Sequence, residues 1–581
     1  MFQERPKGIR NLPRLLMLLG RTRPRNRGGT RGGVSEEDCV KRSLRLLGIS
    51  ACVFGTALVS GCGSTSEDEA KTGPATSIAP TTPAGPINEQ LMIDEIAVFQ
   101  GTKATLVEQG DLKPEAKINA PVIAGRPAFI RVFVKAIAGT RPLVEGELRV
   151  KRAGKEDLVL KDGGKRVVPE LDESMLEQTL NFSVPAEDMT ADATFSVRAG
   201  LELDGPDVLS FPLDGSTAPF NAKTASKTLR VKFVPVSYEA DEGTSLTPEV
   251  DVANLKDTLY KLYPVANVEV TIREPLKWST PVKSNGPGWD ELLTGIMQLR
   301  RADKAERDVY YVGVFTPKAS IDQFCNQGGC ILGVAPGNAD ERDVNQRVAL
   351  VLGYKSRSAG STLAQELAHA MGRMHAPCGV SQAVDDDFPY GSGGIGVWGY
   401  DILKKELVDP GNRYRDFMSY CGPTWTSDYT YKGIFDRMDI VSKQQQAIDA
   451  GNTGGSTPPG SGGAGAATRT MQSFRITSDG AVHEGPQVDV LDAPSSRDDA
   501  SATNASDVTI AYEGAGGSVL SASKARVTTI SGTNSRLVVA PLAPIGATHA
   551  RVVAKGAFTT GDVRARPLSP AAMNAIRSLS H

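Results

Sequence analysis

The sequence contains little histidine, little cysteine and almost no excess of either charge. Its formal net charge is −2 over 581 residues, which gives no reason to expect binding to nucleic acid. The seven cysteines include no Cys-x-x-Cys pair and have no spare histidine nearby, which disfavours a structural zinc site. Only five histidines are present, and two of them, His369 and His375, lie close together.

Glycine and proline, in contrast, are plentiful. The chain has 60 glycines and 36 prolines, so many turns and much β structure are expected outside any helical part. A chain of 581 residues is also too long for a single hydrophobic core, and we expect about two to four domains.

The first 86 residues are predicted to be a leader and a tether. Residues 1–33 are basic and lack periodicity, and we interpret them as an over-extended start, with Val34 as an alternative initiator. Residues 34–62 follow the plan of an export signal, whose apolar run 46–59 is too short for a stable membrane-spanning helix. The run ends in Val-Ser-Gly-Cys62, which resembles the lipobox of bacterial lipoproteins. This resemblance implies lipid on Cys62, attachment to a membrane and a place in the cell envelope or outside the cell.

The remaining segments are predicted from composition and alternation. Residues 63–86 are a flexible linker because almost nothing in them can be buried. Short alternating runs such as 128–134 and 195–203 predict a β-sandwich over residues 87–227. Residues 451–467 form a Gly/Ser/Pro linker, and residues 468–581 are expected to be a second all-β module without an aromatic cluster for carbohydrate binding.

The most informative stretch is residues 365–375, which read Q-E-x-x-H-x-x-G-x-x-H. Residues four apart on a helix share a face, so Gln365 and His369 point the same way, and Glu366 lies where a carboxylate can reach a metal-bound water. Gly372 can end the helix in a left-handed turn and bring His375 back to the same point. This spacing predicts a three-ligand catalytic metal site with an open fourth position.

These residues resemble the zinc signature of the metzincin clan of endopeptidases, and the resemblance continues downstream. Asp-Phe-Met-Ser-Tyr at 416–420 is similar to the clan's Met-turn, with Met418 beneath the metal and Tyr420 where some members have a switchable ligand. The resemblance covers about residues 228–450. It implies an α+β catalytic domain with a twisted mixed sheet and the signature helix, flanked by the two all-β domains.

The resemblance also implies zinc as cofactor and a polypeptide substrate. Zinc would polarise the scissile carbonyl, Glu366 would act as general base, and Tyr420 would stabilise the oxyanion. The segment 331–335 is similar to the edge strand that pairs with substrate in this clan.

The domain is expected to order its elements as follows: strand 229–236, helix 247–262, strand 268–272, helix 289–301, strands 309–315, 331–335 and 348–352, the signature helix from 361, and a last helix 431–450.

Gln365 departs from the signature, where the clan has histidine. An amide oxygen is a weak donor for zinc, and Thr362 to Gln365 also match a capping box. Three alternatives follow: zinc is held through Gln365, His369, His375 and Tyr420; zinc is held weakly with little turnover; or no metal binds. The second function hypothesis is therefore a pseudoprotease, a binding module that keeps the cleft. A purely structural envelope lipoprotein would require the signature to be coincidental.

The cysteines outside the leader are four in number, which suggests two disulfides in an exported chain. We expect Cys325 to pair with Cys330 across a small Gly-rich loop. Cys378 is then expected to pair with Cys421, which would tie the segment after His375 to the Met-turn.

Overall fold

The structure is a computed structural model, and its described residues fall within one compact unit, Pro80–His581. It describes residues 91–136, 141–205, 208–225, 228–239, 246–326, 330–355, 359–411, 413–453, 468–491, 508–554 and 566–567. The predicted leader, the lipidation site Cys62, the linker 63–86 and most of the linker 451–467 lie outside these ranges. No helix within them is long and apolar enough to cross a membrane.

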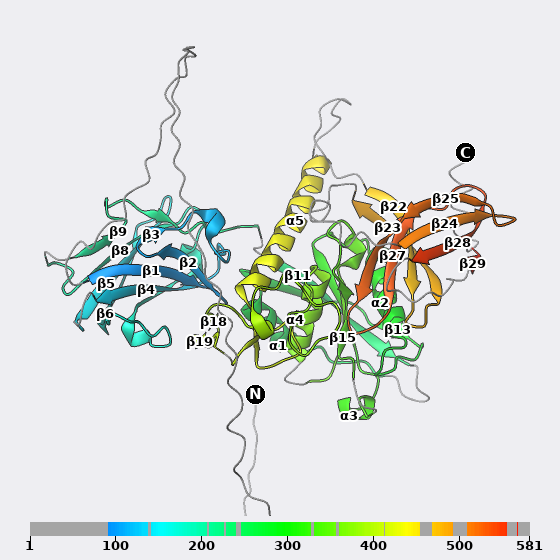
Figure 1. Ribbon diagram of the computed structural model, residues 1–581, viewed down its shortest axis with the longest axis horizontal. Helices are drawn as coiled ribbons and strands as arrows, with labels where there is room; N and C mark the ends of the chain where they lie inside the picture. The colour runs from blue at the N-terminus through cyan, green and yellow to red at the C-terminus, as the bar shows by residue number, and fades with distance from the viewer. Residues whose placement is uncertain are drawn as a thin grey trace, which may run out of the picture. The chain divides into compact units, whose positions relative to one another are not determined.

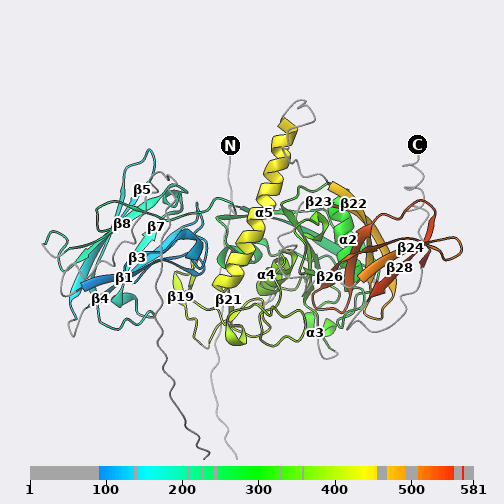
Figure 2. The same cartoon turned by 45° about the horizontal axis from the view of Figure 1, so that its top comes forward.

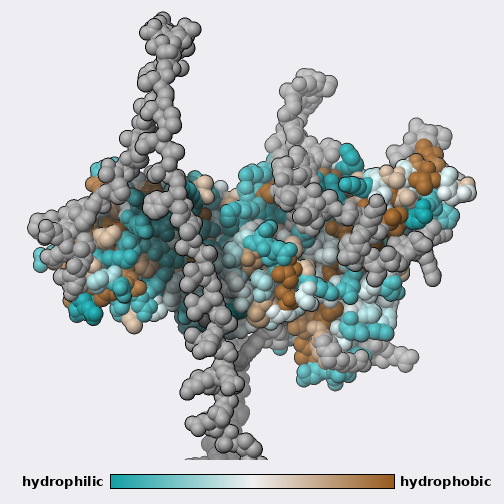
Figure 3. All heavy atoms as spheres, in the orientation of Figure 1, coloured by the Kyte–Doolittle hydropathy of each residue, from teal (hydrophilic) through white to brown (hydrophobic). Residues whose placement is uncertain are grey.

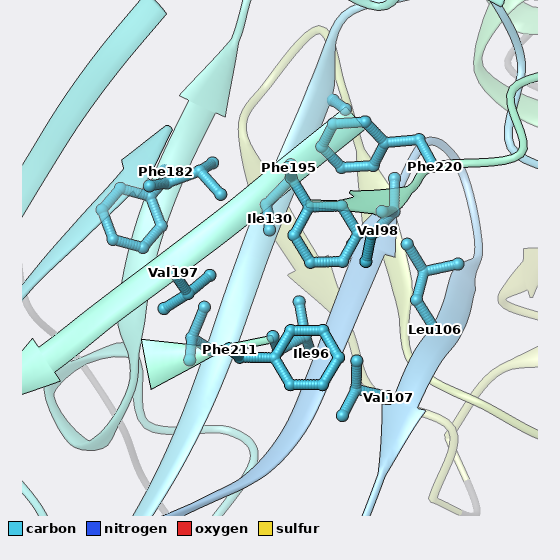
Figure 4. Packing of buried hydrophobic residues seen from close by; sticks show 14 of the residues in the cluster. Ile96, Val98, Leu106, Val107, Ile130, Phe182, Phe195, Val197, Phe211 and Phe220 are labelled. Atoms are coloured by element: carbon cyan, nitrogen blue, oxygen red, sulfur yellow. The ribbon is translucent and has the colours of Figure 1, made fainter. Parts of the chain in front are cut away.

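The first folded part consists of two antiparallel sheets (Figure 1). One sheet has the order β3-β2-β1-β4-β7, and the other has β10-β8-β5-β6 with β9 beside β8. Aromatic and β-branched side chains from both sheets, among them Phe182, Phe195 and Ile130, pack into one core (Figure 4). This two-layer arrangement fits the β-sandwich expected for residues 87–227. The strands are β1 (Leu91–Phe99), β2 (Lys103–Glu108), β3 (Asp111–Leu112), β4 (Ala128–Ala136), β5 (Leu143–Lys151), β6 (Leu158–Arg166), β7 (Leu180–Val184), β8 (Thr194–Gly200), β9 (Leu209–Phe211) and β10 (Ala218–Pro219).

The middle part is built on a mixed sheet of order β12-β11-β14-β17-β15, with β13 also paired to β11. The strands β12, β11, β14 and β17 are parallel, whereas the edge strand β15 runs antiparallel to β17. The strands are β11 (Thr228–Tyr238), β12 (Asn267–Ile272), β13 (Leu276–Trp278), β14 (Val309–Phe315), β15 (Gly333–Val334), β16 (Pro336–Gly337) and β17 (Val348–Leu352). The helices are α1 (Val252–Leu262), α2 (Trp289–Ala302), α3 (Ile321–Phe324), α4 (Ala359–Ala370) and α5 (Asp428–Thr453).

The two faces of this sheet bury different helices. Successive side chains of a strand point to opposite faces, so Val312 and Val314 of β14 share a core with α1 and α4, whereas Tyr311 and Phe315 pack with α2. Both faces are covered, which explains why β14 and β17 are buried along their whole length. This sheet and its helices agree with the α+β class expected for residues 228–450. Four short strands follow α4 and precede α5 in the chain: β18 (Gly399–Asp401), β19 (Glu406–Val408), β20 (Arg415–Asp416) and β21 (Thr424–Trp425).

The C-terminal part also has two sheets around one core, as expected for an all-β module. One sheet has the order β16-β26-β27-β22-β23, and the other has β25-β24-β28-β29. The first sheet includes β16, which follows β15 in the middle part of the chain. The C-terminal module is therefore joined to the middle part by backbone pairing between β26 and β16. The strands are β22 (Thr468–Ile476), β23 (Val482–Leu491), β24 (Val508–Gly514), β25 (Val519–Lys524), β26 (Arg526–Ile530), β27 (Arg536–Pro541), β28 (Ala547–Ala554) and β29 (Arg566–Pro567).

The N-terminal sandwich is joined to the middle part by buried polar contacts. The guanidinium of Arg126 is completely buried and donates to the carbonyl oxygens of Tyr263 and Val265. Tyr431 of α5, the long yellow helix of Figures 1 and 2, donates to Gln100 O at 3.0 Å and contributes its ring to the core of the sandwich. The sandwich and the middle part therefore share an interior.

The described surface is mixed in character. On the face shown in Figure 3, hydrophobic residues form small groups among hydrophilic ones. Single exposed apolar residues are normal for a globular protein. Tyr420 is one of the large apolar side chains that remain exposed, at 58%, and its location beside the candidate site is described below.

Candidate active site

Helix α4 carries Gln365, Glu366 and His369, of which His369 lines a cleft. Its packing against α1 is close, because a Cβ at Gly360 would lie 2.4 Å from Thr258 Oγ1. The helix already begins at Ala359, so Thr362 lies within its first turns rather than at its start. The capping box expected from Thr362 and Gln365 is therefore wrong, and Gln365 does not serve the end of the helix.

The chain leaves α4 by a tight turn at Gly372. This glycine has φ +82°, a left-handed conformation that residues with a Cβ rarely adopt. Gly372 N donates to His369 O at 2.8 Å, and Arg373 N donates to Ala368 O at 2.9 Å, so the last carbonyl groups of the helix are used within the turn. The turn returns the chain toward α4 and places His375 against His369.

The two histidine side chains meet edge to face, and His369 Nε2 lies 3.1 Å from His375 Nε2. Each ring uses its other nitrogen on a backbone carbonyl: His369 Nδ1 lies 2.8 Å from Arg373 O, and His375 Nδ1 lies 3.0 Å from Gln382 O. A carbonyl oxygen only accepts, so both Nδ1 atoms carry the proton, and both Nε2 atoms of the neutral rings are bare.

Neither ring readily takes a second proton. Burial lowers the pKa of His369 to about 3, and the neighbouring His375 contributes to this shift. Burial also lowers the pKa of His375. The Nε2 lone pairs of the two rings face each other at hydrogen-bond distance and repel. A cation bound to both Nε2 atoms would remove this repulsion.

Gln365 lies one turn before His369 on the same side of α4. Its amide nitrogen is buried and has no hydrogen-bond partner among the described residues. A half-turn of the amide exchanges nitrogen and oxygen, so the same buried position can present an oxygen to a cation. Within the ranges that the structure describes, no cluster of three or more His, Cys, Asp and Glu side chains is arranged to hold a metal ion. Of the ligands expected from the sequence, Gln365 and Tyr420 are the two that could be added to the histidines.

Glu366 is buried beside the histidines. Burial raises the pKa of its carboxyl group to about 8, and a hydrogen bond from Ser531 Oγ acts in the opposite direction. Its Cγ also lies close to the edge strand, because a Cβ at Gly333 would be 2.7 Å from it. Glu366 is thus held between α4, β15 and the C-terminal module.

The segment predicted to be the Met-turn packs beside the segment that follows His375. Asp416 is fully buried; its Oδ1 accepts from Met418 N at 2.8 Å and its Oδ2 accepts from Ser427 N at 2.9 Å. Met418 is buried in the same core as α4, and its carbonyl oxygen accepts from Ala376 N, just after His375. The turn is thereby fixed to the histidine segment through its backbone.

Tyr420 follows directly, and its ring centre lies 5.1 Å from that of His375. Although the side chain is more than half exposed, desolvation of the phenol in the cleft and the charge of Glu366 raise its pKa, and it stays protonated at neutral pH. Tyr420 N donates to Cys378 O, and the Cys378–Cys421 disulfide joins the same two segments. The second disulfide, Cys325–Cys330, closes the loop after α3. Both disulfides expected from the sequence are therefore confirmed, and they are consistent with an extracellular or envelope location.

The histidines and Tyr420 line a cleft of about 480 Å³. Its remaining walls are Gly337 of β16, residues 379–383, which follow His375, and residues 529–536 of the C-terminal module. No sequence pattern indicates that Ser531 or its neighbours belong to this site, because they carry no motif and lie far along the chain. Their presence follows only from the pairing of β16 with β26.

Comparison with known proteins does not assign the chain to a family. No protein-family model matches it, and no curated protein matches it. What the site can do chemically therefore has to be inferred from its own residues.

Proposed function

We propose that the chain is a zinc-dependent endopeptidase of the metzincin type, carried in the bacterial cell envelope by lipid on Cys62. The observation that carries this proposal is the approach of two bare imidazole Nε2 atoms to 3.1 Å, with each Nδ1 already bound to a carbonyl. Metal-binding histidines commonly have their second ring nitrogen fixed in this way. The buried amide of Gln365 and the mixed sheet with its antiparallel edge strand support the same proposal.

The residues present fit zinc, with one weak ligand. His369 and His375 would hold the ion through Nε2, and Gln365 would add an amide oxygen, with Tyr420 beside them as a further oxygen donor. Zinc bound there would supply a Lewis acid for the scissile carbonyl and acidify a water molecule. Amide oxygen is a poor donor for zinc, so the affinity is expected to be lower than that of a three-histidine site.

The chain's own residues supply the rest of the chemistry. Beside a bound cation the carboxyl of Glu366 would be ionised in spite of its raised pKa, so that it takes the proton of the attacking water and returns it to the amine that leaves. The phenol of Tyr420, which is protonated at neutral pH, donates a hydrogen bond to the oxyanion of the tetrahedral intermediate. An extended polypeptide that replaces β26 would pair with the backbone groups of β16 and of Ala335 beside the edge strand β15, which gives affinity with little side-chain selectivity.

A second candidate function is favoured by Gln365 itself. If its amide cannot retain zinc, the cleft would still bind an extended polypeptide without hydrolysing it, and the chain would be a pseudoprotease. The two functions differ in metal content and turnover, not in the residues that form the cleft.

The deciding experiment measures zinc per protein chain, together with casein hydrolysis, in the wild type, Gln365→His and Gln446→His. Gln446 is exposed on α5 and controls for the added imidazole. We expect easily stripped zinc in the wild type, and about 10–100-fold tighter zinc with faster hydrolysis in Gln365→His alone. If neither the wild type nor Gln365→His retains zinc, the proposal is wrong. If only Gln365→His retains zinc and hydrolyses casein, the wild type is the pseudoprotease.

A further inference from the structure

A turn of the C-terminal module enters the candidate cleft. We call residues 529–536, at the junction of β26 and β27, the cleft hairpin. Its first residues pair antiparallel with β16: Ile530 lies opposite Pro336, and Thr529 lies opposite Gly337. The pairing continues beyond β26, because Ser531 N donates to Ala335 O at 2.9 Å. The hairpin thus adds a strand along the segment that adjoins the edge strand β15.

The side chain of Ser531 connects this backbone to the catalytic carboxylate. Its hydroxyl accepts from Ala335 N at 2.7 Å and donates to Glu366 Oε2 at 2.7 Å. Ser531 is buried. Both backbone groups of Ala335 and one oxygen of Glu366 are therefore occupied by a single residue of the module.

The hairpin fits closely against both walls of the cleft. Gly532 has φ +67°, and a Cβ there would lie 3.4 Å from Gly333 O, so the chain passes directly over the edge strand. Ile530 is buried in the core that contains Val334. On the other wall, Gln382 Nε2 donates to Asn534 Oδ1 at 3.1 Å, and the carbonyl of this same Gln382 orients His375.

An extended polypeptide that adds to a sheet edge needs the free N–H and C=O groups of that edge. At Ala335 both groups are already bound to Ser531, so the hairpin and an added polypeptide exclude each other there. The attacking water also needs Glu366, whose Oε2 accepts from Ser531. The same turn therefore occupies both the binding edge and one oxygen of the proposed general base.

We propose that the cleft hairpin is a built-in competitor of the polypeptide substrate, which keeps the cleft closed until it is displaced. This inference rests on the proposed function, because it assumes that a polypeptide binds along residues 333–337. Displacement requires separation of β26 from β16 and loss of the two Ser531 side-chain hydrogen bonds. The C-terminal module acts in this way as an internal inhibitor.

The test measures binding of fluorescein-labelled casein to the full chain by fluorescence anisotropy, in chelator, so that no turnover is needed. Ser531→Ala removes both side-chain hydrogen bonds and leaves the backbone pairing. Loss of hydrogen bonds that hold the closed state is expected to tighten casein binding about tenfold. Ser521→Ala, on β25 and outside the residues that line the cleft, is the matched control and should bind casein as the wild type does.

A covalent lock tests the opposite direction. Gly337 and Thr529 are direct partners, and a Cβ at Gly337 would lie 3.3 Å from Thr529 Oγ1, so Gly337→Cys/Thr529→Cys can form a disulfide. The locked protein, verified by mass, should bind casein at least about tenfold more weakly than either single-cysteine variant. Failure of the disulfide to form would show that the hairpin does not occupy this edge.

Two results of the binding measurements would also overturn the inference. Equal casein binding by the wild type, Ser531→Ala and the locked protein means that the hairpin does not compete. Weaker binding by Ser531→Ala together with tighter binding by the locked protein means that the hairpin helps to bind substrate. The proposed function fails separately: casein binding then responds to the hairpin as described, but zinc-loaded Gln365→His does not hydrolyse casein.

Discussion

His369 Nε2 and His375 Nε2 lie 3.1 Å apart although neither has a proton to share. This relationship depends on Gly372 at the end of α4 and on the two carbonyl oxygens that fix the rings. A divalent cation would remove the repulsion between the two lone pairs, so the site should respond strongly to loss of either ring.

Replacement of one ring gives the most direct prediction about the metal. His375→Ala should weaken zinc binding more than the roughly 10–100-fold that loss of an outer partner costs, because a ligand itself is removed. Competition with a chromophoric chelator measures the affinity. His549→Ala, on β28, should leave it unchanged. Equal zinc affinity in both variants would mean that His375 is not a ligand.

Glu366→Gln separates catalysis from metal binding. The amide keeps the shape of the carboxylate but cannot take a proton, so the casein hydrolysis rate should fall about 100- to 10,000-fold while zinc content is retained. Glu406→Gln, on the exposed start of β19, serves as the control and should keep full activity. A rate within a few-fold of the wild type would remove Glu366 from the mechanism.

The raised pKa of Glu366 predicts that the stability of the metal-free protein depends on pH, and Glu366→Gln tests this prediction. Burial raises the pKa of Glu366 to about 8, well above its value in an unfolded chain. The folded state therefore binds more protons between about pH 4.3 and 8, and the free energy of unfolding should decrease as the pH rises through this range.

The expected loss from this one group is of the order of a few kcal/mol. Urea unfolding of the wild type and Glu366→Gln, both in chelator, measures it as the difference between the two pH profiles. Parallel profiles would show that the carboxyl is not buried as described.

Asp416→Asn tests the Met-turn. The amide group can accept from only one of the two backbone N–H groups that Asp416 now satisfies, at Met418 and Ser427, and its NH₂ would face the other. We expect a loss of about 1–3 kcal/mol in the free energy of unfolding, measured with urea. Asp409→Asn, in an exposed turn, should change it by less than about 0.5 kcal/mol.

The two disulfides should differ in their contribution to stability. Cys378 and Cys421 are 43 residues apart, whereas Cys325 and Cys330 are 5 apart. The loop-entropy relation gives about 4 kcal/mol for the longer loop and about 2 kcal/mol for the shorter one. Serine pairs at each position, compared by urea unfolding, measure the difference. A larger loss from the pair at 325 and 330 would contradict this ranking.

Local patterns predicted the middle sheet well. Strands 309–315 and 348–352 begin and end as expected, because buried parallel strands are continuous apolar runs that turn residues bound. The helix expected from 247 begins only at Val252, since Asp251 caps it by accepting from Asn254 N. The strand expected at 195–203 ends at Gly200, and the following residues form a turn.

The site was predictable only in part. Spacing on one helix indicated Glu366, His369 and His375, because α4 and its exit turn are local structure. The edge strand expected at 331–335 is limited to Gly333–Val334, and the chain then continues into β16, which pairs with β26. Pairing between segments almost two hundred residues apart leaves no periodic signal in either one, so Ser531 could not be predicted.

The burial of Arg126 bears on how the protein can be divided. Arg126 lies between β3 and β4, about a hundred residues before residue 228. Its guanidinium donates to the carbonyl oxygens of Tyr263 and Val265, which follow α1. A recombinant piece that starts at 228 would lose those donors and would leave the ring of Tyr431 against solvent. A fragment that is meant to keep the candidate active site should therefore begin before residue 91 and include the sandwich.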